Sequence, residues 1–262
     1  MKLHYRKLGS GRPLVVLHGV FGSSDNLFSV CRTIAETGYE VYILDARNHG
    51  KSERSEEFNY EAMARDLDDF LAEHQVRRPV ILGHSMGGKT VLHYSQQYTN
   101  FSGLVVVDIT ARGYAPHHDH IIQGLQAIAT DTLTSRKEAE EIFSRFVTDP
   151  AERQFLLKNL YRTEGGGFDW RINIPVLAEN QAEVVAEIPL YTKVEQPLLV
   201  LRGAESDYVR DEDVEALREF YPGARLQTVA GAGHWVHAAK PAAFVQAVTD
   251  FMASLPPVEE GE

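Results

Sequence analysis

The sequence predicts an α/β fold: a mostly parallel sheet with helices on both of its faces. Short apolar runs that suit buried strands alternate along the chain with amphipathic stretches that suit helices. The 262 residues are enough for one large core, and α/β domains of this length often stay undivided. A parallel sheet brings the carboxyl ends of its strands to one edge, where we expect the functional residues.

The expected elements follow one another in a regular order. Buried strands are expected at residues 14–17, 41–44, 80–82, 104–107 and 198–201, with weaker flanking strands at 3–7 and 225–229. Amphipathic helices are expected at 26–37, 60–74, 87–98, 211–220 and 241–253.

One long region interrupts this alternation. Residues 111–193 have a helical but irregular pattern with no convincing central strand, and the expected helices there are 121–128, 136–146 and 151–161. An insertion of about eighty residues is too long for a simple crossover between strands. We therefore expect residues 1–110 and 194–262 to form the core, and residues 111–193 to form a helical cap over its active edge. A separate domain is the alternative.

Composition excludes several classes of function. With 26 basic and 37 acidic residues, the formal charge is −11, which argues against a nucleic-acid partner. Cys31 is the only cysteine, so neither an intrachain disulfide nor a thiolate metal cluster can form. No signal core and no run of eighteen apolar residues is found. We expect a cytoplasmic protein without a membrane segment, a cofactor or an obligate protein partner.

A serine lies between an expected strand and an expected helix, within Gly-His-Ser-Met-Gly-Gly at residues 83–88. A G-x-S-x-G pattern at such a junction is typical of a nucleophile elbow, a sharp turn that exposes a serine hydroxyl above a parallel sheet. Gly83 and Gly87 fit, because strand and helix pass closely there. A glycine-rich turn without chemistry is the alternative. We predict that Ser85 is the nucleophile.

A serine nucleophile needs an imidazole to take its proton and a carboxylate to orient that imidazole. Of the eleven histidines, His234 lies late in the chain, on a glycine-flanked loop after the last expected strand. We predict that His234 is the base. His18, His84 and His237 are expected to brace nearby loops. Two acids follow strands that end near the serine, Asp108 after residues 104–107 and Asp207 after residues 198–201, and their spacing leaves both open.

The developing oxyanion needs two converging backbone donors. In a nucleophile elbow the residue after the serine supplies one, and a loop after an early strand supplies the other. Met86 takes the first position. The loop His-Gly-Val-Phe-Gly at residues 18–22 takes the second, with the Val20 amide as first choice and the Phe21 amide as the alternative.

Four segments together resemble an α/β-hydrolase. They are residues 18–22, Asp-Ala-Arg-Asn-His-Gly-Lys-Ser at 45–52, residues 83–89, and Gly-Ala-Gly-His-Trp at 231–235. The Arg-Asn-His-Gly form, Lys89 after the elbow, and Trp-Arg-x-Asn at 170–173 are similar to bacterial YbfF-type esterases and their mitochondrial relatives. The resemblance covers about residues 3–251. It implies hydrolysis of carboxylic esters, with acyl-CoA thioesters as plausible substrates, and an acid in a segment like Val-Asp-Ile at 107–109, which favours Asp108.

The expected partner is a small-molecule acyl ester. Some apolar side chains of residues 111–193 are expected to line an acyl pocket that faces Ser85, and the candidates are Phe143, Phe146, Phe155, Leu156, Leu157, Leu160, Phe168 and Trp170. The cluster His-His-Asp-His at 117–120 could hold a metal, but its place at an expected helix start favours capping. A carbon–carbon bond hydrolase and a non-catalytic ligand receptor are the functional alternatives.

Overall fold

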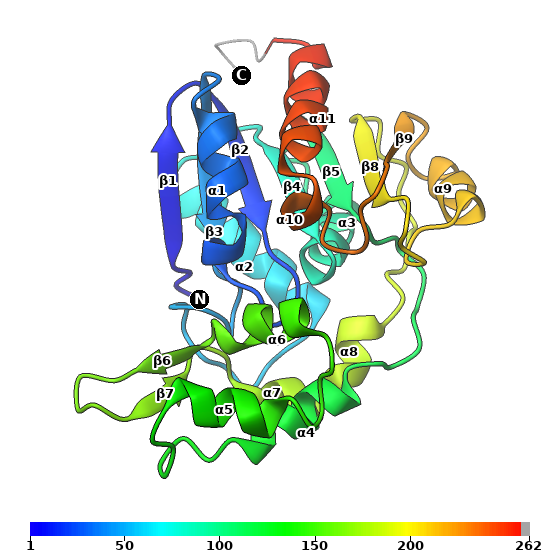
Figure 1. Ribbon diagram of the computed structural model, residues 1–262. Coiled ribbons are helices and arrows are strands. Elements are labelled where there is room, and N and C mark those ends of the chain that lie inside the picture. Colours follow the sequence, from blue (N-terminus) through cyan, green and yellow to red (C-terminus); the bar gives the residue numbers. More distant parts are fainter. Residues whose placement is uncertain (258–262) are drawn as a thin grey trace.

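The computed structural model describes residues 1–257, and its centre is a seven-stranded sheet (Figure 1). The strand order is β1-β3-β2-β4-β5-β8-β9, and only the β1–β3 pair is antiparallel. The strands are β1 (Tyr5–Gly9), β2 (Arg12–Leu17), β3 (Tyr39–Leu44), β4 (Val80–His84), β5 (Gly103–Val107), β8 (Leu198–Gly203) and β9 (Ala224–Val229).

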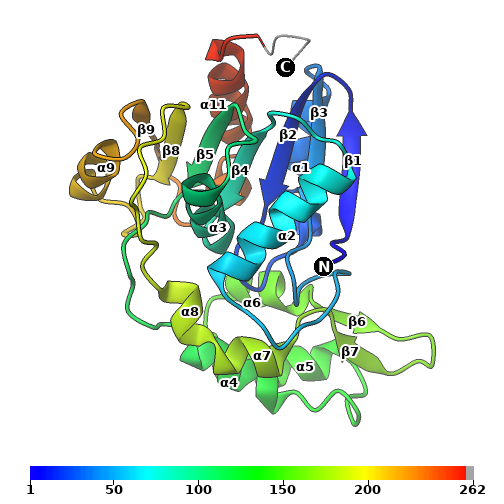
Figure 2. The same ribbon diagram turned by 180° about the vertical axis from the view of Figure 1, so that it is seen from behind.

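Helices cover both faces of this sheet. They are α1 (Ser24–Ala35), α2 (Tyr60–Glu73), α3 (Met86–Gln97), α9 (Asp211–Arg218), α10 (Val236–Ala239) and α11 (Pro241–Ser254). Figure 1 shows α1 and α11 over one face, and Figure 2 shows α2 and α3 over the other. Val15 and Leu17 of β2 pack in one apolar cluster, while Leu14 and Val16 pack in a second. Strands buried on both sides read as continuous apolar runs, which is why the sequence revealed them.

Each strand and helix predicted outside residues 111–193 is present, so the predicted fold class is confirmed. The short helix α10 is an addition that the pattern did not indicate. The division into 1–110, 111–193 and 194–262 stays a prediction, and residues 258–262 lie outside the described part of the chain.

The segment of residues 111–193, here named the insert, crosses the sheet edge where the parallel strands end (Figure 1). Its elements are α4 (Asp119–Ala127), α5 (Arg136–Phe143), α6 (Pro150–Leu157), β6 (Leu160–Arg162), β7 (Phe168–Trp170), α7 (Ile174–Glu179) and α8 (Gln181–Val185). The insert adds no strand to the central sheet, as expected, but β6 and β7, which the pattern did not indicate, pair as a separate antiparallel hairpin. The helix expected at 151–161 therefore ends at Leu157.

A buried lysine joins the insert to the core. Lys89 of α3 is 1% exposed, and its Nζ donates to the carbonyl oxygens of Arg112 (2.7 Å) and Ala186 (2.6 Å). These two carbonyls belong to the first and the last part of the insert. Burial, assisted by the nearby charge of Arg112, lowers the pKa of Lys89 to about 7. The Lys89 side chain thus links the beginning and the end of the insert to helix α3 of the core.

Within residues 1–257, no helix is long and apolar enough to cross a bilayer. The cytoplasmic location, the absence of a nucleic-acid or obligate protein partner, and the absence of a cofactor stay predictions.

Candidate active site

The turn between β4 and α3 holds Ser85 in an unusual backbone conformation, with φ 53° and ψ −119°. Such a conformation is costly for a residue with a side chain and needs close support from its surroundings. The flanking glycines provide room for it: a Cβ on Gly83 would lie 2.1 Å from the Gly87 carbonyl oxygen, and one on Gly87 would lie 2.5 Å from that of Leu17. The Ser85 amide donates to the Val107 carbonyl (3.1 Å). The local geometry is that of a strand–elbow–helix turn.

Three side chains from distant parts of the sequence form one hydrogen-bonded chain. His234 Nε2 lies 3.0 Å from Ser85 Oγ, and His234 Nδ1 lies 2.9 Å from Asp108 Oδ2. Because a carboxylate can only accept, Nδ1 carries the proton and Nε2 is free to accept the serine proton. Asp108 is completely buried, whereas the His234 side chain is 21% exposed. This arrangement can remove the hydroxyl proton as the oxygen attacks.

The two candidate acids differ in their surroundings. Asp108 follows β5 with a φ of 52°, and Oδ1 accepts from the Gly203 amide (2.9 Å). Its Oδ2 accepts from the Ser206 hydroxyl as well as from His234. The Asp207 side chain is exposed, and its backbone carbonyl accepts from Arg112. The structure therefore places Asp108, and not Asp207, against the imidazole.

The expected oxyanion donors come from two elements, the elbow and the loop after β2. Met86 is the first residue of α3, where amides lack an intrahelical acceptor. In the loop after β2, the Phe21 amide already donates to His49 Nε2 (3.2 Å). Phe21 also has a positive φ of 59°. The use of the Phe21 amide within the loop favours Val20 as the second donor.

The histidines packed behind the site brace it in a neutral form. His18 bridges the Gly19 carbonyl (2.7 Å) and the Ala46 amide (3.0 Å). His84 Nε2 lies 2.9 Å from the His234 carbonyl oxygen. Burial lowers the pKa of His84 well below its usual value, and it lowers the pKa of His237 to about 4. These rings add no fixed positive charge beside His234.

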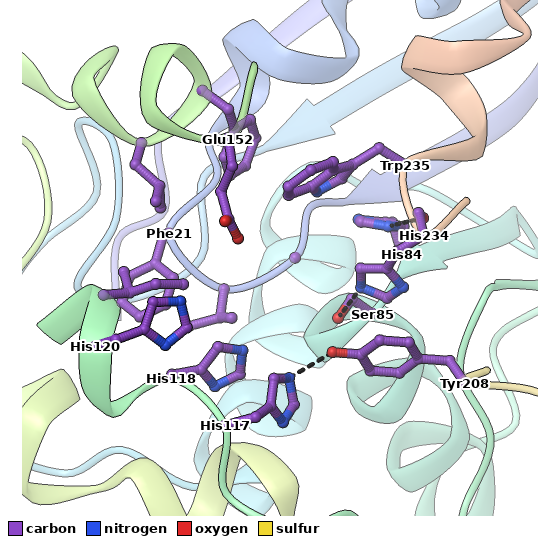
Figure 3. A pocket seen from close by; sticks show the side chains of 15 residues that line it. Phe21, His84, Ser85, His117, His118, His120, Glu152, Tyr208, His234 and Trp235 are labelled. Atoms are coloured by element: carbon purple, nitrogen blue, oxygen red, sulfur yellow. Dashed lines mark hydrogen bonds between the residues drawn. The ribbon is translucent and has the colours of Figure 1, made fainter. Parts of the chain in front are cut away.

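A cavity of about 220 Å³ opens over Ser85 between the sheet edge and the insert (Figure 3). The core side contributes the loop of residues 19–21, the elbow, Tyr208, His234 and Trp235. The insert contributes His117, His118, His120, Ile121, Glu152, Phe155 and Leu156. Most of the exposed wall is apolar surface, although five histidines, Ser85, Glu152 and Tyr208 also line it, and a concave apolar wall suits a small molecule. Figure 3 shows the Glu152 carboxyl group directed into the cavity.

Most apolar side chains proposed for an acyl pocket pack elsewhere. Of the eight candidates, Phe155 and Leu156 line this cavity. The others include Phe143, Leu160 and Trp170, which lie in the core that the insert builds with the sheet edge. A helix of the insert must bury one face for its own stability, so apolar content alone did not distinguish wall from core.

Two side chains that the sequence reading did not select also reach the site. Ser206 donates to Asp108, and the Tyr208 ring stacks on the imidazole of His234. Both lie in the loop after β8, beside the alternative acid. Their position after a central strand was the available signal, but serine and tyrosine in a loop have many other roles.

Comparison with known proteins identifies the family of the chain. A family model described as alpha/beta hydrolase fold matches residues 12–147. The mouse sn-1-specific diacylglycerol lipase ABHD11 is 38% identical over 248 residues, 92% of this chain and 80% of the relative. Esterase YbfF of Escherichia coli K12 is 35% identical over 244 residues, 92% of each chain.

A solved structure gives the same result. The marine microorganism esterase has a TM-score of 0.92 and 38% sequence identity, over 95% of this chain and 99% of the other. These relatives confirm the resemblance to YbfF-type esterases that the sequence motifs indicated. The chain therefore belongs to the α/β-hydrolase fold family and is a carboxylic ester hydrolase.

Proposed function

We propose that the protein hydrolyses acyl esters through Ser85, His234 and Asp108, with a covalent acyl-enzyme intermediate. The observation that carries the proposal is the continuous chain of hydrogen bonds from Ser85 Oγ through the imidazole to a fully buried carboxylate. The strained elbow supports it, since backbone strain is often kept at functional sites.

In the first step the Ser85 hydroxyl gives its proton to His234 Nε2 as the oxygen attacks the ester carbonyl carbon. The amides of Val20 and Met86 donate hydrogen bonds to the carbonyl oxygen and stabilise the negative charge that develops on it. The tetrahedral intermediate collapses, and His234 returns the proton to the departing alcohol. Water then gives a proton to His234 as it attacks the acyl group on Ser85, and His234 passes this proton to Ser85 Oγ as the acid leaves.

The leaving group in this scheme needs only to accept a proton from the imidazole, so a thiol would serve as well as an alcohol. Acyl-CoA thioesters are therefore included in the proposed substrates. The largely apolar wall with Phe155 and Trp235 suits the acyl chain. Each methylene that reaches the wall is worth about 0.8 kcal/mol, so kcat/KM should rise with acyl length until the cavity is full.

Substitution of the proposed nucleophile and base tests this function. Ser85→Ala and His234→Ala should each lower kcat on p-nitrophenyl esters by about 10⁴-fold or more, and the double variant should lose little beyond either single one, because the pair acts as a unit. Ser144→Ala, a change at an exposed serine of the insert, is the control. Turnover by Ser85→Ala near the wild-type rate would overturn the proposal. Matched acyl-CoA substrates test the thioester part.

A further inference from the structure

Figure 3 shows the Tyr208 ring next to the imidazole of His234, and the two rings are stacked. The ring centroids are 3.9 Å apart and the planes differ by 19°. An aromatic face at this distance attracts a cation, and an imidazolium forms in both chemical steps of the proposed reaction. The stack therefore acts most strongly when the imidazole carries its second proton.

The insert holds Tyr208 in this position through three side chains. The Tyr208 hydroxyl is hydrogen-bonded to His117 Nε2. The Tyr208 carbonyl oxygen accepts from the Tyr114 hydroxyl (2.9 Å) and from Arg112 Nη2 (3.3 Å). All three partners belong to the first part of the insert, so both ends of the tyrosine are fixed from that side.

We propose that Tyr208 is a positioning residue that fixes the plane of the His234 ring and stabilises its protonated form. Because the insert holds Tyr208 in place, the orientation of the ring and the stability of the imidazolium both depend on the docked insert. This inference rests on the proposed function of His234. The insert then has two tasks: it closes the pocket, and it completes the support of the base.

The other titratable groups packed around His234 do not stabilise the face of its protonated ring. They come from several elements and are Asp108 after β5, His84 of β4, His118 before α4 and His237 of α10. Asp108 contacts the ring edge through Nδ1, and the three histidines are kept neutral because burial lowers their pKa values. Tyr208 is the partner that covers a face of the ring.

Three variants separate the ring face from the hydroxyl group. Tyr208→Leu removes the stack, Tyr208→Phe keeps it and loses the bond to His117, and His117→Ala removes the same bond from the other side. Tyr191→Leu is the control, because Tyr191 is 62% exposed. Thermal melting confirms that each variant is folded, and titration with a fluorophosphonate counts the active sites. Failure of wild-type labelling would count against the proposed function and not against this inference.

Tyr208→Leu should lower kcat about tenfold, the size of a cation–π contact in a shielded site, with KM changed by less than about threefold. The acidic limb of its kcat/KM profile should move to lower pH, because the protonated imidazole has lost a favourable contact. Tyr208→Phe and His117→Ala should each cost about twofold, and their combination no more than either alone, since they remove one hydrogen bond.

Two results would overturn the inference. If Tyr208→Leu raised KM but kept kcat and the pH profile, the ring would be only a wall of the pocket. If Tyr208→Phe were as impaired as Tyr208→Leu, the hydroxyl group and not the ring face would be the important element.

Discussion

The core side and the insert side of the pocket are built differently. On the core side, the Asp108 carboxylate is fully buried and accepts hydrogen bonds from a backbone amide, a serine and the imidazole. On the insert side, His117 and His120 are exposed and Glu152 is half-buried. The core side also carries strained backbone at Ser85 and Asp108, each with a positive φ.

This difference separates two tasks. A buried, fully hydrogen-bonded group keeps one geometry, which a reaction step requires. Half-exposed groups on an insert contact whatever enters the pocket, so they influence which substrate is accepted. We expect changes on the core side to reduce kcat for all esters, and changes on the insert side to redistribute activity among esters.

A large effect is expected on the core side, at the buried acid. Asp108→Asn removes the charge that stabilises the imidazolium and favours the wrong tautomer, so kcat should fall by about 10⁴-fold, as for a triad acid in a serine protease. Asp207→Asn is the matched control and should stay close to wild type, because its side chain is exposed. Steady-state kinetics of the two variants make the comparison. A normal Asp108→Asn enzyme beside an inactive Asp207→Asn enzyme would reverse the assignment.

A smaller, selective effect is expected at Glu152. Its carboxyl group is directed into the cavity, and burial raises its pKa above the usual value. At pH 8 the ionised carboxylate should repel an anionic acyl group, and Glu152→Gln should improve kcat/KM for the mono-p-nitrophenyl ester of glutaric acid by about tenfold, a screened like-charge contact. Activity on p-nitrophenyl valerate should hardly change.

Glu164→Gln, at an exposed glutamate of the insert that does not line the cavity, is the control for this selectivity. Equal gains on the charged and the neutral ester would mean that Glu152 affects the pocket by its size and not by its charge.

The last effect concerns the link between the two sides, and it appears in stability and not in the rate of hydrolysis. The pKa of Lys89 is about 7 in the folded protein and near 10.4 in an unfolded chain. Between these values the unfolded state binds more protons, so the free energy of unfolding gains up to about 1.4 kcal/mol per pH unit as the pH rises. Below pH 7 both states are protonated and this gain is absent. Lys89→Met should lose this pH dependence.

Urea denaturation from pH 6 to pH 9 measures the difference between the wild type and Lys89→Met. Lys137→Met, at a side chain that is 86% exposed, should parallel the wild type. If the free energy of unfolding of Lys89→Met changed with pH in parallel with the wild type, the buried amine would not change its protonation on folding in this range.

The same contrast explains what the sequence could predict. Strands such as β4 and β5 are buried on both faces, so their apolar runs stand out, and the elbow requires glycines at fixed positions. The hairpin of β6 and β7 was missed because each strand has three residues, too few for a period to show. The pairing of these two strands is determined by packing within the insert.

The local sequence pattern also could not decide which aspartate lies against His234. Asp108 and Asp207 both follow a central strand, and the difference between them is the direction of the chain after the strand. Asp108 turns inward with a positive φ, and the Gly203 amide meets its carboxylate. For Tyr208 the position after a strand was the only signal and was too weak to select it, because its contact with His234 joins two loops that are distant in sequence.

The central claim is that Ser85 is the covalent nucleophile of this site. Mass spectrometry of the intact protein after reaction with a fluorophosphonate tests it most directly, followed by mapping of the labelled peptide. We predict a single adduct per wild-type chain, located on Ser85, and no adduct on folded Ser85→Ala protein. An adduct on Ser85→Ala, or one that maps to another residue of the wild type, would contradict the account.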